Sequence, residues 1–112
     1  MLIYKIFRAG EWADLQRTGE SAGAPVDLSD GFIHFSTAGQ VAETAARHFA
    51  ETDGLMLAAV ETAALGPALR WEPSRGGALF PHLYRPLRRD EVTWVQPLSL
   101  AGGQHVFPKD MQ

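Results

Sequence analysis

Cysteine is missing from all 112 positions of this sequence. A chain without cysteine forms no disulfide, binds no metal through thiolates and has no cysteine nucleophile. This composition is typical of proteins from a reducing compartment, so we expect a cytoplasmic location.

Long hydrophobic runs are also missing. The longest apolar run, Leu55 to Val60, is far shorter than the roughly 20 residues that a membrane-spanning helix needs. The first residues, Met1 to Lys5, lack the basic and long apolar segments of a signal peptide. We therefore expect no membrane partner.

Positive charge is scarce, since 10 lysines and arginines face 13 acidic residues and the formal net charge is -3. The nearest basic run, Arg85, Arg88 and Arg89, is offset at once by Asp90 and Glu91. Nucleic-acid binding needs a concentrated basic surface, so we expect no nucleic-acid partner. The chain also lacks His-x-x-x-His spacing and a Gly-x-Ser-x-Gly elbow, so we expect neither a metal site nor a serine hydrolase.

Hydrophobic periodicity predicts a small α+β domain, with helices early in the chain and strands late. Residues 20–30 show no periodicity and are predicted to form a loop, either a binding loop or an ordinary connector. The predicted strands are 2–7, 32–36, 55–60, 69–72 and 92–95, and the predicted helices are 10–18 and 37–51. Pro81 makes 78–84 an edge or bent strand. We expect one domain over residues 1–98 and a loosely ordered tail over 99–112, where Gly102 and Gly103 interrupt any pattern.

The segment from Asp30 to Thr37 has the clearest chemical character. Strand alternation puts Phe32, His34 and Ser36 on one face, and Thr37 with Gln40 has the spacing of a helix capping box. His34 could hydrogen-bond to a ligand from a fixed position, or it could be a half-buried histidine bonded to neighbouring backbone.

Two later segments carry further polar groups. In Trp71-Glu72-Pro73-Ser74-Arg75-Gly76-Gly77, the Arg75 guanidinium would suit a phosphate or carboxylate, although Glu72 and Arg75 could simply pair on the surface. In Phe80-Pro81-His82-Leu83-Tyr84, His82 and Tyr84 share one side of an extended chain. They could bind a flat ring, or they could form an aromatic edge with polar tips in water.

These three segments resemble the signature blocks of a small bacterial family, the domain-of-unknown-function family numbered nine-five-two. The resemblance covers residues 1 to 98. That family is grouped by fold with the ADP-ribosyltransferases, so the resemblance implies two small, perpendicular sheets with an N-terminal helical part around an NAD-sized cleft.

The resemblance also implies roles for individual residues. His34-Phe35-Ser36 is similar to the transferase pattern that holds the nicotinamide ribose and amide, with Thr37 beside it. Tyr84 would stack on nicotinamide, and Arg75 would take the pyrophosphate. NAD, or a related small nucleotide, is the ligand that the resemblance implies.

This chain departs from the transferase pattern because no glutamate falls at the position that stabilises the developing cation. Glu72 lies in a different motif, and His82 could act where relatives use an acid. The first of three hypotheses is therefore a domain that binds NAD or a related nucleotide, in which His34, Glu72 and His82 could also catalyse transfer. The second is a non-catalytic module that binds a different small molecule or a protein. The third is a hydrolase with His34 and His82 as an acid/base pair.

Overall fold

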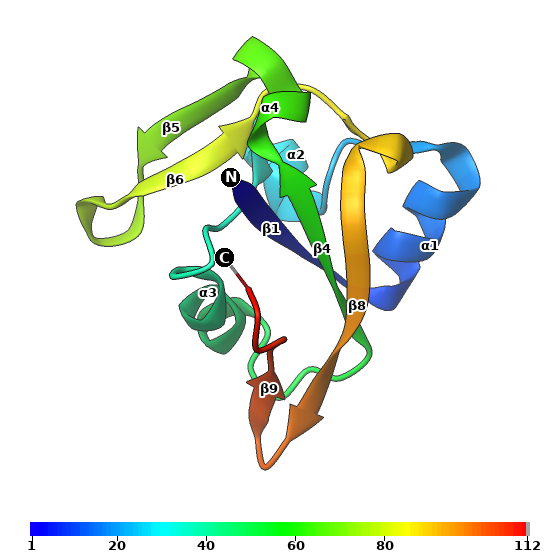
Figure 1. The fold of residues 1–112 in the computed structure, drawn as a ribbon, viewed down its shortest axis with the longest axis vertical. Coiled ribbons are helices and arrows are strands. Elements are labelled where there is room, and N and C mark those ends of the chain that lie inside the picture. Colours follow the sequence, from blue (N-terminus) through cyan, green and yellow to red (C-terminus); the bar gives the residue numbers. More distant parts are fainter. Residues whose placement is uncertain (112) are drawn as a thin grey trace.

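A computed structural model describes residues 1–111 of the chain. Figure 1 shows a mixed α and β domain with curled antiparallel sheets. Its elements in chain order are β1 (Leu2–Phe7), α1 (Ala9–Thr18), β2 (Glu20–Ser21), α2 (Pro25–Asp30), β3 (Ile33–His34), α3 (Val41–His48), β4 (Leu55–Glu61), α4 (Thr62–Leu65), β5 (Leu69–Pro73), β6 (Leu79–Leu83), β7 (Leu87–Arg88), β8 (Val92–Ala101) and β9 (Gln104–Val106).

The largest sheet has four strands in the order β1-β4-β8-β9, and every pairing is antiparallel. The two inner strands, β4 and β8, run side by side in Figure 1. Leu57 to Val60 of β4 are fully buried, because both faces of the sheet are covered. The predictions of a strand over 2–7 and of a doubly buried strand over 55–60 are confirmed.

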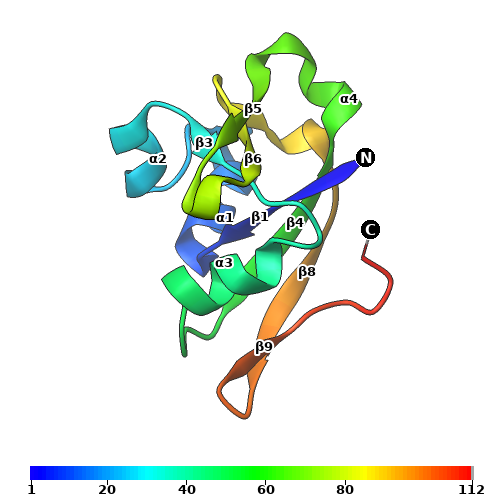
Figure 2. The ribbon, with the colours of Figure 1, turned by 90° about the vertical axis from the view of Figure 1, so that its left-hand side faces the viewer.

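Alternation along β1 and β4 divides the core between the two faces of this sheet. One face packs against α1 through Leu15 and also contacts Ile33 and Leu83 of the second sheet. The other face packs against α3 through Val41 and Ala45. Figure 2 shows α3 beside β1 of this sheet.

The second sheet has three strands in the order β3-β6-β5, and a third sheet pairs β2 with β7. Residues 1–111 form three sheets, whereas the resemblance implied two. The central strand of the second sheet is β6, although it contains Pro81 and was predicted to be an edge or bent strand. The Pro81 carbonyl accepts from the Phe35 N–H beyond the end of β3. Its nitrogen faces the same side, so the missing N–H interrupts no ladder.

Residues 33–36 cross from one sheet to the other. Ile33 and His34 pair with β6, whereas Ser36 forms an isolated bridge with Tyr4 of β1. The Tyr4 N–H donates to the Ser36 carbonyl at 2.7 Å, and the Ser36 N–H donates to the Tyr4 carbonyl at 2.9 Å. His34 and Ser36 therefore lie at the junction of the two sheets.

Three sequence predictions differ from the structure. Residues 20–30 form β2 and α2 instead of a loop. Alternation in 69–72 predicts Trp71 inward and Glu72 outward, but in β5 Trp71 is exposed and Glu72 is half-buried. The predicted helix over 37–51 is shorter, because α3 begins at Val41 and ends at His48.

The predicted boundary at residue 98 falls inside β8. β8 leaves β4 after Leu98 and continues into a hairpin with β9, and Phe107 and Met111 pack against the core cluster to which α3 contributes Val41 and Ala45. The segment predicted as a loose tail is therefore built into the domain up to residue 111, and residue 112 lies outside the described residues. Within the described part of the chain, no helix is long and apolar enough to cross a membrane.

Candidate functional site

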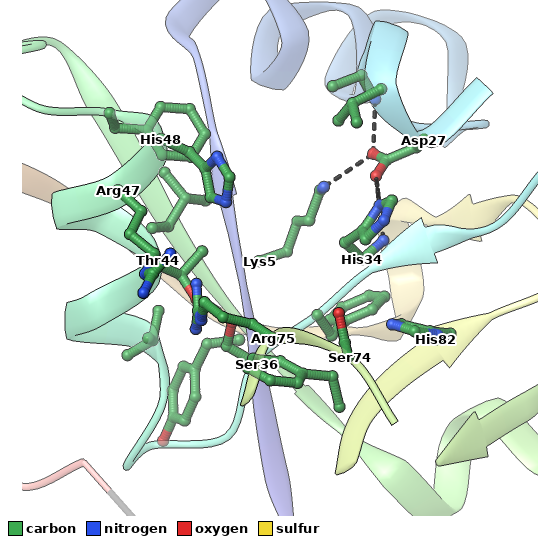
Figure 3. A pocket seen from close by; sticks show the side chains of 18 of the residues that line it. Lys5, Asp27, His34, Ser36, Thr44, Arg47, His48, Ser74, Arg75 and His82 are labelled. Atoms are coloured by element: carbon green, nitrogen blue, oxygen red, sulfur yellow. Dashed lines mark hydrogen bonds and ion pairs between the residues drawn. The ribbon is translucent and has the colours of Figure 1, made fainter. Parts of the chain in front are cut away.

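A pocket of about 630 Å³ lies at the junction of the two sheets, between α2 and α3. Figure 3 shows Asp27 and His34 on one side, Thr44, Arg47 and His48 of α3 on the other, and Lys5 between them. Its polar lining residues are Lys5, Arg8, Asp27, Asp30, His34, Ser36, Thr44, Arg47, His48, Ser74, Arg75 and His82.

Asp27 is the anchor of this pocket. It is the third residue of α2, and its Oδ2 accepts from the Ala24 N–H at 2.8 Å, which caps the helix. The same oxygen accepts from the Lys5 Nζ at 2.8 Å, and Oδ1 accepts from the His34 N–H at 3.1 Å. The carboxylate is 1% exposed, so β1, α2 and β3 are fixed to one another by a buried charge.

The pKa of Asp27 is lowered from 3.8 to about 2. Burial raises it, but the hydrogen bond from the His34 ring and the positive charge of Lys5 outweigh that effect. Asp27 is therefore ionised at neutral pH and serves as the counter-ion of the buried Lys5 ammonium.

Both ring nitrogens of His34 face carboxylates. Nδ1 lies 2.5 Å from the Asp27 Oδ1, and Nε2 lies 3.0 Å from the Asp30 Oδ2 at the end of α2. Only the imidazolium carries a hydrogen on each nitrogen, so the two contacts together suit the protonated ring. Asp30 is half-exposed and occupies the Nε2 position that a ligand group would take.

His82 pairs with His34 across β3 and β6, and the ring centroids are 5.4 Å apart. The His82 Nδ1 lies 2.8 Å from the Glu72 Oε1, which also accepts from the Tyr84 hydroxyl at 2.7 Å. Phe32 stacks on the His82 ring at 4.0 Å. These hydrogen bonds lower the pKa of Glu72, and the Glu72 carboxylate raises the pKa of Tyr84.

A chain of hydroxyl groups connects α3 to the turn between β5 and β6. The Ser36 and Thr44 hydroxyls are 2.9 Å apart, and the Arg75 Nη2 donates to the Thr44 Oγ1 at 3.2 Å. The guanidinium of Arg75 also lies over the Phe80 ring, 4.8 Å from its centroid. Arg75 is thus held at the pocket wall and not in a free loop.

The structure brings four of the predicted site residues into the pocket and leaves three outside its lining. His34, Ser36, Arg75 and His82 line it. Thr37 lies in the turn before α3, where its N–H donates to the Gln40 Oε1 at 3.0 Å. Glu72 lies behind His82, and Tyr84 lines a separate cavity of about 220 Å³, with the Arg70 guanidinium over its ring.

Sequence reasoning missed several pocket residues, among them Lys5, Asp27 and three side chains of α3. Lys5 carried a usable signal, because alternation places it between Ile3 and Phe7 on an apolar strand face. Asp27 follows Pro25 at the spacing of a helix start, but a six-residue helix is too short for periodicity to reveal. Thr44, Arg47 and His48 share one face of α3 by i, i+3, i+4 spacing and resemble a solvated face in sequence.

Metal ligands are not grouped in the described part of the chain. Among residues 1–111, no three histidine, aspartate or glutamate side chains come close enough together to hold a metal ion.

The fold and the pocket define a small mixed α and β domain with an open polar site between curled antiparallel sheets. The chain belongs to the DUF952 family, described as a protein of unknown function, which it matches over residues 6–95. The family part of the resemblance drawn from the three sequence blocks is thereby confirmed. No curated protein matches this chain.

Solved structures of one bacterial relative share this fold. The crystal structure of protein CC0527 from Caulobacter crescentus is 50% identical, with a TM-score of 0.91 over 95% of this chain and 94% of that one. The solution NMR structure of CC0527 is also 50% identical, with a TM-score of 0.83 over 93% of this chain and 90% of that one.

Proposed function

We propose that the pocket binds a nucleotide-type small molecule, with NAD and ADP-ribose as the first candidates. The observation that carries the proposal is the convergence of His34, Ser36 and Arg75 on one pocket of about 630 Å³. This volume falls in the range of roughly 300–1,000 Å³ of small-molecule sites. The resemblance to the ADP-ribosyltransferases suggested these three side chains as ligand contacts.

The contacts of His34 support a role in ligand binding. Asp27 holds its Nδ1, so the ring has a fixed orientation, and a ligand group would take the place of the half-exposed Asp30 carboxylate at Nε2. A ring fixed in this way loses little rotational freedom when it hydrogen-bonds to a ribose hydroxyl or an amide oxygen. Ser36, at the same junction, offers a second hydroxyl to the same part of the ligand.

Transfer of ADP-ribose is not part of the proposal. Glu72 already accepts hydrogen bonds from His82 and Tyr84 and does not line the pocket. A glutamate placed in that way would not reach the sugar carbon on which positive charge develops. The proposal therefore stops at binding.

Calorimetric titration with NAD, ADP-ribose and nicotinamide tests the proposal. We expect saturable binding of NAD or ADP-ribose that His34→Ala abolishes and Arg75→Gln weakens, while circular dichroism shows that both variants are folded. The control is Arg17→Gln, which removes an exposed arginine of α1 that pairs with Asp14 outside the pocket. A folded protein that releases no heat with any of the three compounds would contradict the proposal and favour a module for another small molecule or a protein.

A second candidate function is hydrolysis of an ADP-ribosyl or related phosphoester bond. It is favoured by the pairing of His34 and His82, whose rings are 5.4 Å apart and whose Nδ1 atoms each contact a carboxylate. One imidazole would take a proton from water as the water oxygen attacks the phosphorus of a phosphoester or the ribose carbon of an ADP-ribosyl bond. The other imidazole, protonated, would give its proton to the leaving atom as the bond from that atom to phosphorus or carbon breaks. A bell-shaped pH–rate profile that loses one limb in each of His34→Ala and His82→Ala would support it.

A further inference from the structure

The α3 side of the pocket carries more positive charge than its neighbours neutralise. Thr44, Arg47 and His48 lie on the helix face toward the pocket, and Arg75 approaches from the turn after β5 (Figure 3). We name Thr44, Arg47, His48 and Arg75 the α3 wall. Arg8, at the end of β1, also lines the pocket.

Aromatic rings hold two of these arginines in place. The Arg75 guanidinium carbon lies 4.8 Å from the centroid of Phe80, and the Arg8 guanidinium carbon lies 4.8 Å from the centroid of Phe49. Arg75 is further fixed by its hydrogen bond to the Thr44 hydroxyl. Guanidinium groups that are already oriented lose little freedom when they bind an anion.

The acidic partners around the α3 wall are too few to balance it. The Glu43 Oε1 lies 3.3 Å from the Arg47 Nε and 3.9 Å from the Arg75 Nε, so one carboxylate serves two arginines. Arg8 pairs with Glu11 at 3.4 Å. The pocket's own carboxylates are engaged elsewhere, Asp27 with Lys5 and His34 and Asp30 with His34.

The pKa of His48 reflects this excess of positive charge. Burial lowers the pKa of His48, and the charges of Arg75, Arg47 and His34 lower it further. An anion on the α3 wall would offset the repulsion from these cations and favour the protonated ring.

From this geometry we propose that the α3 wall is a phosphate subsite, and that its occupation is coupled to the uptake of a proton by His48. The inference rests on the proposed function and narrows it. The ligand must carry a phosphate or pyrophosphate group, so ADP-ribose should bind and nicotinamide alone should not. Arg47 and Arg75 would donate to the phosphate oxygens, with protonated His48 as a third donor.

The sign of the pH dependence follows from linkage. The free protein holds its His48 proton less tightly than the complex does, so binding takes up a proton at pH values between the two pKa values of His48. The affinity should therefore rise as the pH falls through this window and level off below it. ADP-ribose is a suitable probe, because its pyrophosphate is a diester with no proton that titrates near neutral pH.

The experiment is calorimetric titration of the full chain with ADP-ribose at pH 6 and pH 7, in buffers of different ionisation enthalpy. The dependence of the heat on the buffer gives the number of protons taken up. We expect proton uptake in the unmodified protein and none in His48→Gln, with affinity about fivefold lower in that variant. Arg47→Gln, which alters an exposed side chain, should weaken binding similarly, and Glu43→Gln should strengthen it about threefold.

The matched control is His105→Gln. His105 lies in the C-terminal hairpin and does not line the pocket, and its Nε2 donates to the Thr52 carbonyl. Proton uptake and affinity should therefore stay unchanged in this variant. If ADP-ribose binds and depends on His34 but shows no proton uptake and no effect of Glu43→Gln, the phosphate subsite is wrong and the proposed function stands. If the folded protein binds no ADP-ribose, both proposals fail.

Discussion

At the scale of single residues, Asp27 connects more parts of the molecule than any other polar group described above. Its two oxygens receive the Ala24 N–H, the Lys5 ammonium and two nitrogens of His34. A buried ion pair contributes little by comparison with apolar packing, but a buried charge that loses its partner is costly. Removal of either Asp27 or Lys5 would therefore destabilise the fold, because the other would remain as a buried charge without a partner.

Stability should depend on the ionisation of Asp27. The folded pKa of about 2 lies below the ordinary 3.8, so the unfolded chain binds the proton first as the pH falls. The stabilisation, about 2 kcal/mol, is present above pH 4 and is lost as the pH falls from about 4 to 2. Urea denaturation across this range should show the loss.

Asp27→Asn should remove that pH dependence and lower the free energy of unfolding by about 3–5 kcal/mol at pH 7, because Lys5 then lacks a counter-ion. Asp14→Asn is the matched control, since Asp14 is an exposed aspartate paired with Arg17. Equal effects of the two substitutions would contradict the role given to Asp27.

The pKa of Tyr84 should reveal whether its hydrogen bond to Glu72 forms. The Tyr84 hydroxyl donates to the Glu72 carboxylate, which raises the pKa of the phenol by favouring its protonated form. In Glu72→Gln the pKa of Tyr84 should fall back toward its ordinary value. Ultraviolet titration of phenolate measures this change, with Tyr84→Phe identifying the Tyr84 signal. An unchanged titration in Glu72→Gln would show that the pair does not form.

The residues of the site were only partly predictable, for a physical reason. His34, Ser36, Arg75 and His82 stood out because polar groups on strands and in glycine-flanked turns break a regular pattern. The α3 wall did not stand out, because polar residues at i, i+3, i+4 spacing are also typical of a helix face in water. Which face is solvated depends on what packs against the helix, and that is set by the tertiary fold.

At the scale of elements, α2 is the segment on which the pocket depends most. It is six residues long, begins after Gly23 and ends before Gly31, and both glycines have positive φ. A helix this short is not stable by itself, so its position depends on the contacts of Asp27.

The two glycines that flank α2 should respond differently to substitution. A Cβ on Gly31 would meet nothing within 4 Å, whereas a Cβ on Gly23 would lie 2.5 Å from the Asp27 Cβ. Gly31→Ala should cost about 1 kcal/mol through backbone strain alone. Gly23→Ala should cost about 3 kcal/mol, because Asp27 must also move away from its partners. Denaturant titration of both variants tests this, and equal losses would contradict it.

Element prediction succeeded where a segment is long and its pattern is simple. The strands 2–7 and 55–60 were found because burial on one or two faces leaves a clear signal over six residues. β2, α2 and β7 were missed because two to six residues hold too few periods. The prediction for β6 was wrong because of Pro81. The missing N–H of Pro81 costs no strand pairing here, since the neighbouring strand β3 is only two residues long and ends before it reaches Pro81.

At the scale of the whole molecule, the domain extends beyond the boundary predicted at residue 98. His105 of the β8–β9 hairpin bonds to the Thr52 carbonyl, and Phe107, which follows β9, packs against the core cluster that contains Val41 and Ala45 of α3. Composition could not reveal this, because Gly102 and Gly103 form the tight turn of the hairpin, and paired glycines are equally typical of a loosely ordered tail.

Removal of residues 99–112 should lower the free energy of unfolding by about 2 kcal/mol, through lost burial of apolar surface. Thermal and urea denaturation measure this. Phe107→Ala should reproduce about half of the loss, and Val106→Ala, at an exposed neighbour, should have little effect. A truncated chain as stable as the full one would restore the shorter boundary.

The isolated bridge between Tyr4 and Ser36 connects the two sheets at a single point, so this junction could act as a hinge. The pocket lies beside this junction, so rotation of one sheet against the other would change the distance between His34 and the α3 residues of the pocket, Thr44, Arg47 and His48. A ligand that contacts both His34 and α3 would hold the two sheets in one relative orientation. The amide protons of Tyr4 and Ser36 therefore report on opening of this bridge. Their exchange with deuterated solvent should slow when a ligand is bound.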